Sequence, residues 1–266
     1  VHQYDMNITI CPRGPRTVMS VNDISLEAVI SESSSVFGKD LGFLKGYTHK
    51  IILKPQAIPV QHKLRKVPLC ARSEVKKMLG DMLNNDVIEP VESSSWVSPV
   101  VISTKSDGTF RFCVDLRSLN ANVVADTFPL PNINEMVQLL EGGKYFSKLD
   151  LKHAYHQVKL HPESKIFTAF ITSEGIFQFK RLPFGLCSTA SVFQRLMMHL
   201  FKGMSKVLYF QDDILIYGDT VNSHNAILRQ VLHRLRVAGL TLKCDKCKFL
   251  EKEVEYLGYT ISGEGI

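Results

Sequence analysis

Two adjacent aspartates, Asp212 and Asp213, interrupt an apolar run of strand-forming residues, and this pair constrains the fold more than any other feature. It is the only Asp-Asp pair in the chain and lies between the segments KVLYF and ILIYG. A third aspartate, Asp150, ends a similar run, YFSKLD. Aspartate is depleted in strands, and a buried carboxylate is costly unless it is paired or bound to a metal ion. The three carboxylates therefore need partners.

Two apolar strands that each deliver carboxylate at one end predict a divalent cation site. Hard oxygen ligands suit Mg²⁺ or Mn²⁺. Two such cations, about 3.5–4 Å apart, stabilise both the attacking and the leaving oxygen of a phosphoryl transfer. The alternative is that Asp212 and Asp213 form an ordinary hairpin turn and that Asp150 caps a strand. Spacing alone leaves both interpretations open.

Helical and strand-like segments are mixed along the chain without strict βαβ alternation, which predicts an α+β fold. Residues 1–45 show no sustained periodicity, apart from one short helix expected around 26–30, and are interpreted as an upstream linker or arm. Apolar spacing and turn residues predict helices over 75–83, 132–140, 188–201 and from 228 to a stop at Gly239, hairpins about Ser106-Asp107-Gly108 and Ser173-Glu174-Gly175, a strand pair about Asp212-Asp213, and a strand-like run over 254–262.

Composition adds weaker constraints. Lys plus Arg exceed Asp plus Glu by 32 − 26 = 6, which is compatible with a polyanionic partner without demanding one. No run of about 18 apolar residues occurs, so no membrane span is expected. The six cysteines are scattered and are interpreted as reduced intracellular thiols. Cys244 and Cys247 form a C-x-x-C, but no second pair completes a zinc site, so two ordinary thiols are the preferred interpretation.

Five segments, in this order, closely resemble the reverse transcriptase of gypsy-type LTR retrotransposons, which is kin to retroviral polymerases. They read SPVVISTKSDGTFRFCVDLRSLN, FSKLDLKHAYHQVKLHP, KRLPFGLCSTASVFQRLM, VLYFQDDILIYG and VEYLGYTIS. The resemblance covers roughly residues 37–266. It implies a right-hand polymerase whose palm is an antiparallel sheet backed by helices.

The resemblance also implies a division of the chain. Residues 46–145, with 160–185 returning to them, match the fingers, and residues 146–266 match the palm up to the start of a thumb. The chain is then a fragment of a Pol polyprotein that also carries protease, RNase H and integrase regions. Expected locations are a cytoplasmic virus-like particle or the nucleus.

Site residues follow from the resemblance, position by position. Asp150, Asp212 and Asp213 match the catalytic carboxylates, and the family's metal site also takes a main-chain carbonyl, here that of Leu151. The implied cofactors are two Mg²⁺ or Mn²⁺ ions. The implied partners are an RNA or DNA template with its primer, and dNTPs.

Four further residues match the nucleotide site. Arg111 matches the arginine that grips the incoming triphosphate, and Lys105 is the expected partner of the γ-phosphate, with a solvated turn lysine as the alternative. Tyr155 matches the bulky residue that closes against a sugar 2′-hydroxyl, so the product should be DNA, with a core tyrosine on a helix as the alternative. Phe184, in the turn Pro183-Phe184-Gly185, lies near nucleotide and template in the family, with plain packing as the alternative.

Residues expected at the template or primer are Gln194, Arg195, Phe210, Gln211, Leu257, Gly258 and Tyr259, the last three in the hairpin that holds the primer end. For Gln194 and Arg195 a helix-surface role is the alternative. The family's acidic motif reads Y-x-D-D with a small or aliphatic x, whereas this chain has Phe210 and Gln211. Neither change touches a metal ligand.

Two other functions compete with a reverse transcriptase domain. A non-catalytic, retrotransposon-derived protein that only binds nucleic acid would explain the departures at Phe210 and Gln211. A different palm polymerase or a primase would use the same carboxylates, but would accept ribonucleotides, which Tyr155 argues against. The sequence leaves the oligomeric state open.

Overall fold

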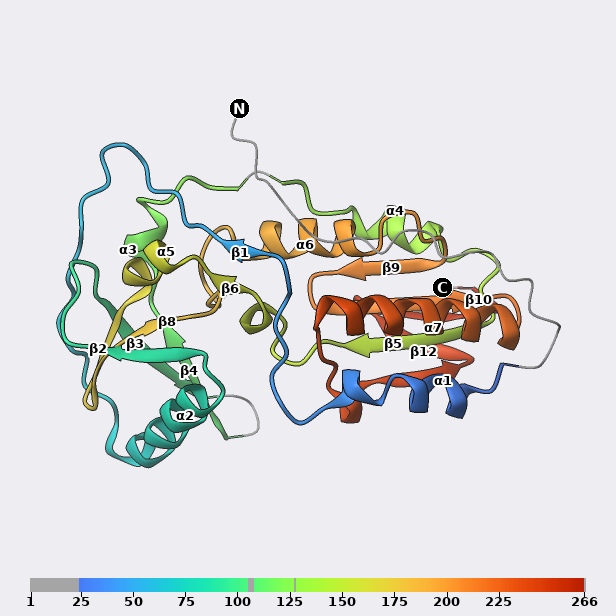
Figure 1. Cartoon of the computed structure of the whole chain (residues 1–266), viewed down its shortest axis with the longest axis horizontal. Helices are drawn as coiled ribbons and strands as arrows, with labels where there is room; N and C mark the ends of the chain where they lie inside the picture. Colours follow the sequence, from blue (N-terminus) through green and yellow to red (C-terminus); the bar gives the residue numbers. More distant parts are fainter. Residues whose placement is uncertain (1–23, 105–107, 127, 266) are drawn as a thin grey trace. The chain divides into compact units, whose positions relative to one another are not determined.

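The computed structural model describes residues 24–104, 108–126 and 128–265 of the 266-residue chain. They divide into two compact units (Figure 1). Unit 1 comprises residues 24–46, 128–154 and 191–265, and unit 2 comprises residues 47–104, 108–126 and 155–190. Each unit is described by itself. No helix of the described residues is long and apolar enough to cross a membrane.

Unit 1 is built on a four-stranded antiparallel sheet with the strand order β11-β5-β10-β9. Its elements are α1 (Leu26–Glu32), η1 (Ser34–Phe37), α4 (Ile133–Gln138), β5 (Tyr145–Asp150), α6 (Thr189–Leu200, whose first two residues fall in unit 2), β9 (Val207–Phe210), β10 (Asp213–Gly218), α7 (Val221–Ala238), η5 (Cys244–Lys246), β11 (Lys248–Glu251), β12 (Glu253–Tyr256) and β13 (Tyr259–Ser262). The strand pair expected about Asp212-Asp213 is β9–β10, and the run over 254–262 is the β12–β13 hairpin.

Side chains alternate across this sheet, so each strand contributes to two faces. One face carries an apolar cluster, which the β12–β13 hairpin and α4 complete. Its buried members are Met136, Leu140, Phe146, Leu208, Leu215, Tyr217, Val254, Tyr256 and Ile261. The other face carries Leu149, Ile214 and Ile216, all fully buried, and α7 lies across β10 and β5 (Figure 1).

Helix α7 has the boundaries that its sequence specifies. Thr220 caps its start by accepting the N–H of Ser223, whose side chain in turn accepts the N–H of Thr220. Its apolar row is fully buried and comprises Leu228, Val231, Leu232 and Leu235. The expected stop at Gly239 is confirmed, with φ of 79°. A Cβ there would also lie 2.6 Å from the carbonyl oxygen of Phe43. Both the positive φ and this close approach therefore favour glycine at the end of the helix.

The segment interpreted as an upstream linker or arm is described from residue 24, and its residues 24–45 pack within unit 1. The short helix expected around 26–30 is α1, and it packs on α7. Val29 is fully buried, and Glu32 pairs with Arg229 at 3.0 Å. The Nδ2 group of Asn225 donates to the carbonyl of Ile24 over 2.7 Å. Residues 1–23 lie outside the described residues.

Unit 2 is built on a five-stranded mixed sheet with the strand order β2-β8-β7-β3-β4. Its elements are β1 (Thr48–His49), η2 (Leu69–Ala71), α2 (Arg72–Asn84), β2 (Ile88–Val91), β3 (Ser98–Thr104), β4 (Phe110–Val114), α3 (Arg117–Asn120), β6 (Lys159–Leu160), α5 (Pro162–Lys165), η4 (Ile166–Thr168), β7 (Phe170–Thr172) and β8 (Gly175–Phe179), while η3 (Ala154–Gln157) begins one residue before it. The two expected hairpins are β3–β4 and β7–β8. Residues 105–107, in the first hairpin turn, lie outside the described residues.

The units differ from the expected division at residue 145. Residues 128–145 belong to unit 1, because Met136 and Leu140 are part of its apolar cluster. Residues 155–159 and 186–190, expected with the palm, belong to unit 2. The mixture of helices with a mainly antiparallel sheet confirms the predicted α+β class.

Candidate active site

The β9–β10 hairpin brings the three predicted carboxylates to one end of the unit 1 sheet. Asp213 opens β10, and a two-residue loop of Gln211 and Asp212 joins it to β9. On its other side β10 pairs with β5, and Asp213 lies directly opposite Asp150 in that ladder. The N–H of Leu151 donates to the carbonyl of Asp212 over 3.3 Å. Strand register therefore gathers the residues that the sequence singles out, and their catalytic role stays a prediction.

Each of the two facing carboxylates has a lysine near it. Lys148 Nζ lies 3.4 Å from Asp213 Oδ1, and Lys246 Nζ lies 3.8 Å from Asp150 Oδ2. Burial raises the pKa of Asp213; Lys148 opposes this rise, while the negative charges of Asp212 and Asp150 add to it. Three carboxylates thus meet only two lysines, and further positive charge at this end of the sheet would be stabilising.

The three carboxylates are suitable ligands for a divalent cation, although they do not form a complete coordination site in this structure. Within the described residues, no three His, Cys, Asp or Glu side chains are grouped so that they could hold a metal ion. Asp150 and Asp213 face each other across the ladder and are partly buried, whereas Asp212 is exposed at the loop. The donors are all hard oxygens, which fit Mg²⁺ or Mn²⁺. A site formed by all three carboxylates would need Asp212 to lie closer to the other two than it does in this structure.

A buried amide on α6 holds the loop between β9 and β10. Gln194 is 2% exposed, and its Nε2 group donates to the carbonyl of Tyr209 over 3.1 Å. Its Oε1 atom accepts the N–H of Gln211 over 3.0 Å. The sequence places Gln194 at the template strand or on the helix surface. The side chain is buried in unit 1 and binds the hairpin backbone, which contradicts the helix-surface alternative, while its contact with the template strand stays a prediction.

Two other predicted template residues also pack within unit 1. The guanidinium carbon of Arg195 lies 5.4 Å from the ring centroid of Phe128, a cation–π geometry. Phe210 is partly buried against the apolar cluster. The phenylalanine that replaces the family's tyrosine therefore has a packing role, while its contact with nucleic acid stays a prediction.

The expected primer hairpin is the β12–β13 hairpin. Leu257 and Gly258 form its two-residue loop with φ of 52° and 86°, the positive values that primed hairpin turns require. The hydroxyl of Tyr259 donates to Asn134 Oδ1 over 3.2 Å, and its ring remains 39% exposed. The hairpin is confirmed, and its contact with a primer stays a prediction.

The residues expected to bind the triphosphate belong to unit 2. Arg111 is exposed on β4, opposite Ser103 on β3. Within residues 24–104, 108–126 and 128–265, its guanidinium makes no ion pair or hydrogen bond. Lys105 lies outside the described residues. Because the two units are described separately, the convergence of Arg111 and the carboxylates on one nucleotide stays a prediction.

Tyr155 and Phe184 are brought together in unit 2. Tyr155 lies in η3, and its ring centroid is 4.8 Å from that of Phe184 at an interplanar angle of 58°. His156 makes an edge contact with the same phenylalanine at 5.2 Å. Phe184 is nevertheless 51% exposed. The two aromatic residues that the sequence assigns to the nucleotide therefore support one another.

The turn that carries Phe184 is held by the side-chain amide of Asn120. Its Nδ2 group donates to the carbonyl of Gly185 over 2.8 Å, and its Oδ1 atom accepts the N–H of Cys187 over 2.9 Å. Gly185 has φ of 87°, a conformation that side chains disfavour. The hydroxyl of Thr189 donates to the carbonyl of Pro183 over 2.9 Å.

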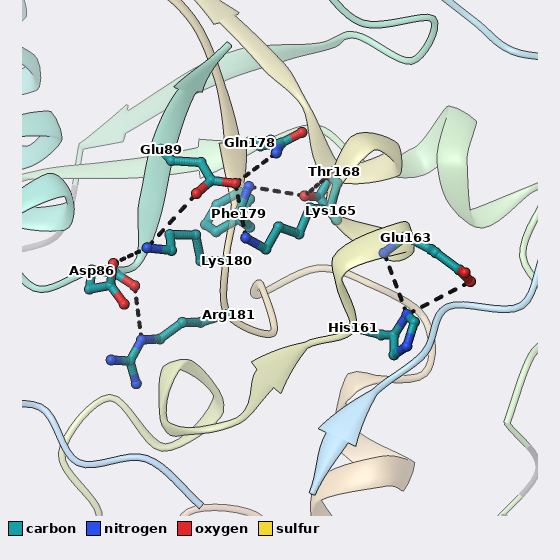
Figure 2. A network of polar contacts seen from close by, with 10 residues as sticks. All are labelled: Asp86, Glu89, His161, Glu163, Lys165, Thr168, Gln178, Phe179, Lys180 and Arg181. Atoms are coloured by element: carbon teal, nitrogen blue, oxygen red, sulfur yellow. Dashed lines mark hydrogen bonds and ion pairs between the residues drawn. The ribbon is translucent and has the colours of Figure 1, made fainter.

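A buried arginine holds the turn that carries Tyr155. Arg181 is 5% exposed, its Nε group donates to the carbonyl of Asp86 over 3.0 Å, and its Nη1 group donates to the carbonyl of His156 over 3.1 Å. Figure 2 shows Arg181 beside Asp86, at the edge of a charged network. Burial lowers the pKa of Arg181, and the charge of Asp86 opposes this effect. An arginine keeps its charge there, because its ordinary pKa is far above neutral.

Glu89 is the centre of that network (Figure 2). It accepts hydrogen bonds from Lys165 at 3.0 Å and from Gln178 at 2.8 Å, and Lys180 Nζ lies 3.8 Å away. Burial acts to raise the pKa of Glu89, but the hydrogen bonds and the lysine charges lower it overall. These contacts join β2, β8 and α5, so they fix the sheet edge next to Arg181.

Sequence reasoning missed several residues that shape these sites. Lys148 had a signal, because it precedes Asp150 by two positions in a strand and must lie on the same face. Lys246 and Arg181 had none, since the first reaches Asp150 from a distant 3₁₀ turn and the second acts through backbone carbonyls. The C-x-x-C also lies here. Burial raises the pKa of the Cys247 thiol to about 11, which keeps it protonated and disfavours it as a metal ligand.

Comparisons with known proteins agree with this arrangement. The family model described as reverse transcriptase (RNA-dependent DNA polymerase) matches residues 103–261, more than half of the chain. The retrovirus-related Pol polyprotein from transposon opus of Drosophila melanogaster is 33% identical over 214 residues, covering 78% of this chain and 21% of the relative. That from transposon 297 of the same organism is 31% identical over 235 residues, covering 86% and 22%. The chain thus spans about a fifth of these relatives.

Solved structures share the fold. The foamy viral protease-reverse transcriptase in complex with an RNA/DNA hybrid has a TM-score of 0.82 at 23% identity, covering 88% of this chain and 32% of that one. A foamy viral protease-reverse transcriptase in complex with double-stranded DNA has a TM-score of 0.80 at 24% identity, covering 89% and 42%. At this level of identity the likeness shows the fold.

Proposed function

The chain belongs to the reverse transcriptase (RNA-dependent DNA polymerase) family, and we propose that it is the fingers and palm of a retrotransposon Pol enzyme that extends a primer with dNTPs on an RNA or DNA template. Unit 1 is the palm in this proposal, and unit 2 is the fingers. The observation that carries it is the register of the unit 1 sheet, which sets Asp213 opposite Asp150 with Asp212 in the adjoining loop.

The reaction joins the primer 3′-oxygen to the α-phosphorus of the dNTP and breaks the bond to pyrophosphate. Two divalent cations, when bound, lower the barrier by stabilising both the attacking and the leaving oxygen. Asp150, Asp212, Asp213 and the carbonyl of Leu151 would hold them. The half-buried setting of Asp150 and Asp213 limits solvent screening, which strengthens their attraction for cations.

The fingers residues position the nucleotide in this proposal. Arg111, exposed on β4, grips the triphosphate through bidentate contacts. Lys105 adds a charge at the γ-phosphate. Tyr155, supported by Phe184, fills the space that a 2′-hydroxyl would need, so that dNTPs are selected.

The test is primer extension on an RNA template with dNTPs and Mg²⁺ or Mn²⁺. Asp150→Asn removes a metal-binding charge and should reduce extension by about a thousandfold or more, roughly 4 kcal/mol of transition-state stabilisation. Binding of the primer–template duplex, followed by fluorescence anisotropy, should stay within about twofold. Asp219→Asn is the matched control, because Asp219 follows the other end of β10 and pairs with Lys206 at 2.8 Å.

Each outcome has a distinct meaning. Extension by the wild type and by Asp219→Asn, but not by Asp150→Asn, supports the proposal. Equal extension by all three proteins would show that the carboxylates are not the metal site. Duplex binding without extension by the wild type would instead favour the non-catalytic alternative, for which the unusual Phe210-Gln211 sequence is the motive.

A further inference from the structure

We propose that Gln194 is a positioning residue that holds the carboxylate loop in its metal-binding conformation. The inference rests on the proposed function and deepens it, because it names the group that prepares the site before cations bind. Gln194 contacts none of the three carboxylates in the hydrogen bonds described; it acts through the backbone of the loop that carries Asp212.

The loop has a backbone conformation that needs support. Gln211 has φ of 54°, in the left-handed region, which is disfavoured for a residue with a Cβ atom. Two-residue hairpin loops usually place glycine, asparagine or aspartate at such positions. A glutamine there indicates that contacts from outside the loop stabilise the conformation.

Gln194 supplies those contacts at the end of β9 and at the start of the loop. Its Nε2 group binds the carbonyl of Tyr209, on β9, and its Oε1 atom binds the N–H of Gln211, the first loop residue. Since the side chain is 2% exposed, water cannot readily replace either bond. The amide therefore spans the point at which the strand becomes the loop and fixes the direction in which the chain continues.

The direction of the chain after Gln211 determines where Asp212 and Asp213 lie. Asp212 follows Gln211, and its carbonyl is bound by the N–H of Leu151. Asp213 comes next and enters the ladder opposite Asp150. A loop that loses its bond at Gln211 can move Asp212 away from the position from which its side chain turns toward the other two. Because the three carboxylates are not already grouped as a cage, cation affinity depends on this loop.

The variant Gln194→Met tests the proposal, since methionine has a similar length and no hydrogen-bonding amide. Two controls accompany it. Met198→Ala changes an exposed residue one turn further along α6. Val231→Ala removes buried methyl groups from α7 and destabilises unit 1 without touching the loop.

The first two measurements do not require activity. Hydrogen exchange of the Gln211 amide should accelerate by about tenfold or more in Gln194→Met, because its acceptor is gone. Mn²⁺ titration, followed by electron paramagnetic resonance of free Mn²⁺, should show about fivefold or greater weakening of binding. Met198→Ala should match the wild type in both experiments, and Val231→Ala should keep the wild-type affinity for Mn²⁺.

Primer extension is the third measurement. In Gln194→Met, kcat should fall by about tenfold or more at a fixed Mg²⁺ concentration and recover partly at high Mg²⁺, while the KM for dNTP stays within about twofold. The proposal is overturned if Gln194→Met keeps wild-type Mn²⁺ affinity and Gln211 protection, or if Val231→Ala weakens Mn²⁺ binding equally. If the wild type itself does not extend primers, the proposed function fails, and the exchange and Mn²⁺ measurements still decide the role of Gln194.

Discussion

Two loops that carry predicted site residues are each held by one side-chain amide, but in different ways. In unit 1 the amide of Gln194 binds a loop 15 to 17 positions away, and it is buried. In unit 2 the amide of Asn120 binds a turn 65 to 67 positions away, in a more exposed setting. The first loop continues directly into a sheet, whereas the second depends on contacts between distant segments.

The difference shows how each unit fixes its own candidate site residues. In unit 1, strand register sets Asp150 opposite Asp213, whereas the placement of Asp212 depends on the adjoining loop that Gln194 binds. In unit 2, Tyr155 lies in a 3₁₀ turn and Phe184 in a loop, and their contact depends on Arg181 and Asn120. Changes in unit 1 should therefore abolish chemistry, and changes in unit 2 should alter the choice and the affinity of the nucleotide.

The largest effect expected in unit 2 is on sugar discrimination. Tyr155→Val removes the ring that fills the space next to the sugar, so incorporation of rNTPs relative to dNTPs should rise about 10- to 100-fold. The measurement is the ratio of kcat/KM for the two nucleotides. Tyr155→Phe keeps the ring and its contact with Phe184, so it should keep the discrimination. An unchanged ratio in Tyr155→Val, or a large drop in kcat with dNTPs, would break the separation between the two units.

A smaller effect is expected when the turn that carries Phe184 loosens. Asn120→Ala removes two hydrogen bonds from the turn and should cost about 1–2 kcal/mol of unfolding free energy. The KM for dNTP should rise about three- to tenfold with kcat unchanged. Asn122→Ala is the matched control, because its amide also makes two bonds, to Ile58 and Ser118, away from the turn. Equal KM values in the two variants would show that the turn does not position the nucleotide.

The sequence predicts more of the candidate site in unit 1 than in unit 2, for a physical reason. Carboxylates at the ends of apolar runs are an anomaly that can be recognised locally, and the alternation of a strand places Lys148 beside them. The amides of Gln194 and Asn120 and the guanidinium of Arg181 bind backbone atoms of other segments. Backbone groups look the same at every residue, so no motif marks these contacts. They become visible only when the segments are placed in space.

The boundary between the units shows the same limit. The expected division at residue 145 follows the order of the motifs, but Met136 and Leu140 pack into the apolar cluster of the unit 1 sheet. Similarly, residues 24–45 had no recognisable motif, and their place in unit 1 depends on the buried side chains of Val29, Val36 and Leu44 and on bonds to α7. Packing partners, unlike strand-end charges, cannot be assigned from one segment alone.

The smallest expected effect is a difference between the two units in how their stability changes as the pH falls. His224, in α7 of unit 1, is fully buried, its Nδ1 atom lies 2.9 Å from Asn225 Oδ1, and its Nε2 atom has no hydrogen-bond partner among the described residues. Burial lowers the pKa of His224, and the contact with Asn225 opposes this only in part. In unit 2, the hydrogen bonds of Arg117 hold the pKa of Asp115 far below its ordinary value, although burial acts against them.

His224 and Asp115 should affect the free energy of unfolding in different pH ranges. The unfolded chain binds a proton at His224 more tightly than the folded chain does, so unit 1 should lose stability as the pH falls below about 6.5, by at most about 1.4 kcal/mol per pH unit. Stability from Asp115 is present above its ordinary pKa of 3.8 and is lost only below it. Between pH 7.5 and 5, exchange protection should therefore fall in α7 and stay constant in β4 and α3.

The control for this window is His224→Gln, which cannot titrate. Asp213 has a raised pKa and would act in the opposite direction, but it is common to both proteins and cancels in their difference. Thermal unfolding of the two proteins in EDTA should show a steeper decline for the wild type between pH 7 and 5. Equal slopes would show that His224 does not cause the acid sensitivity of unit 1, and the buried histidine would then be a packing residue only.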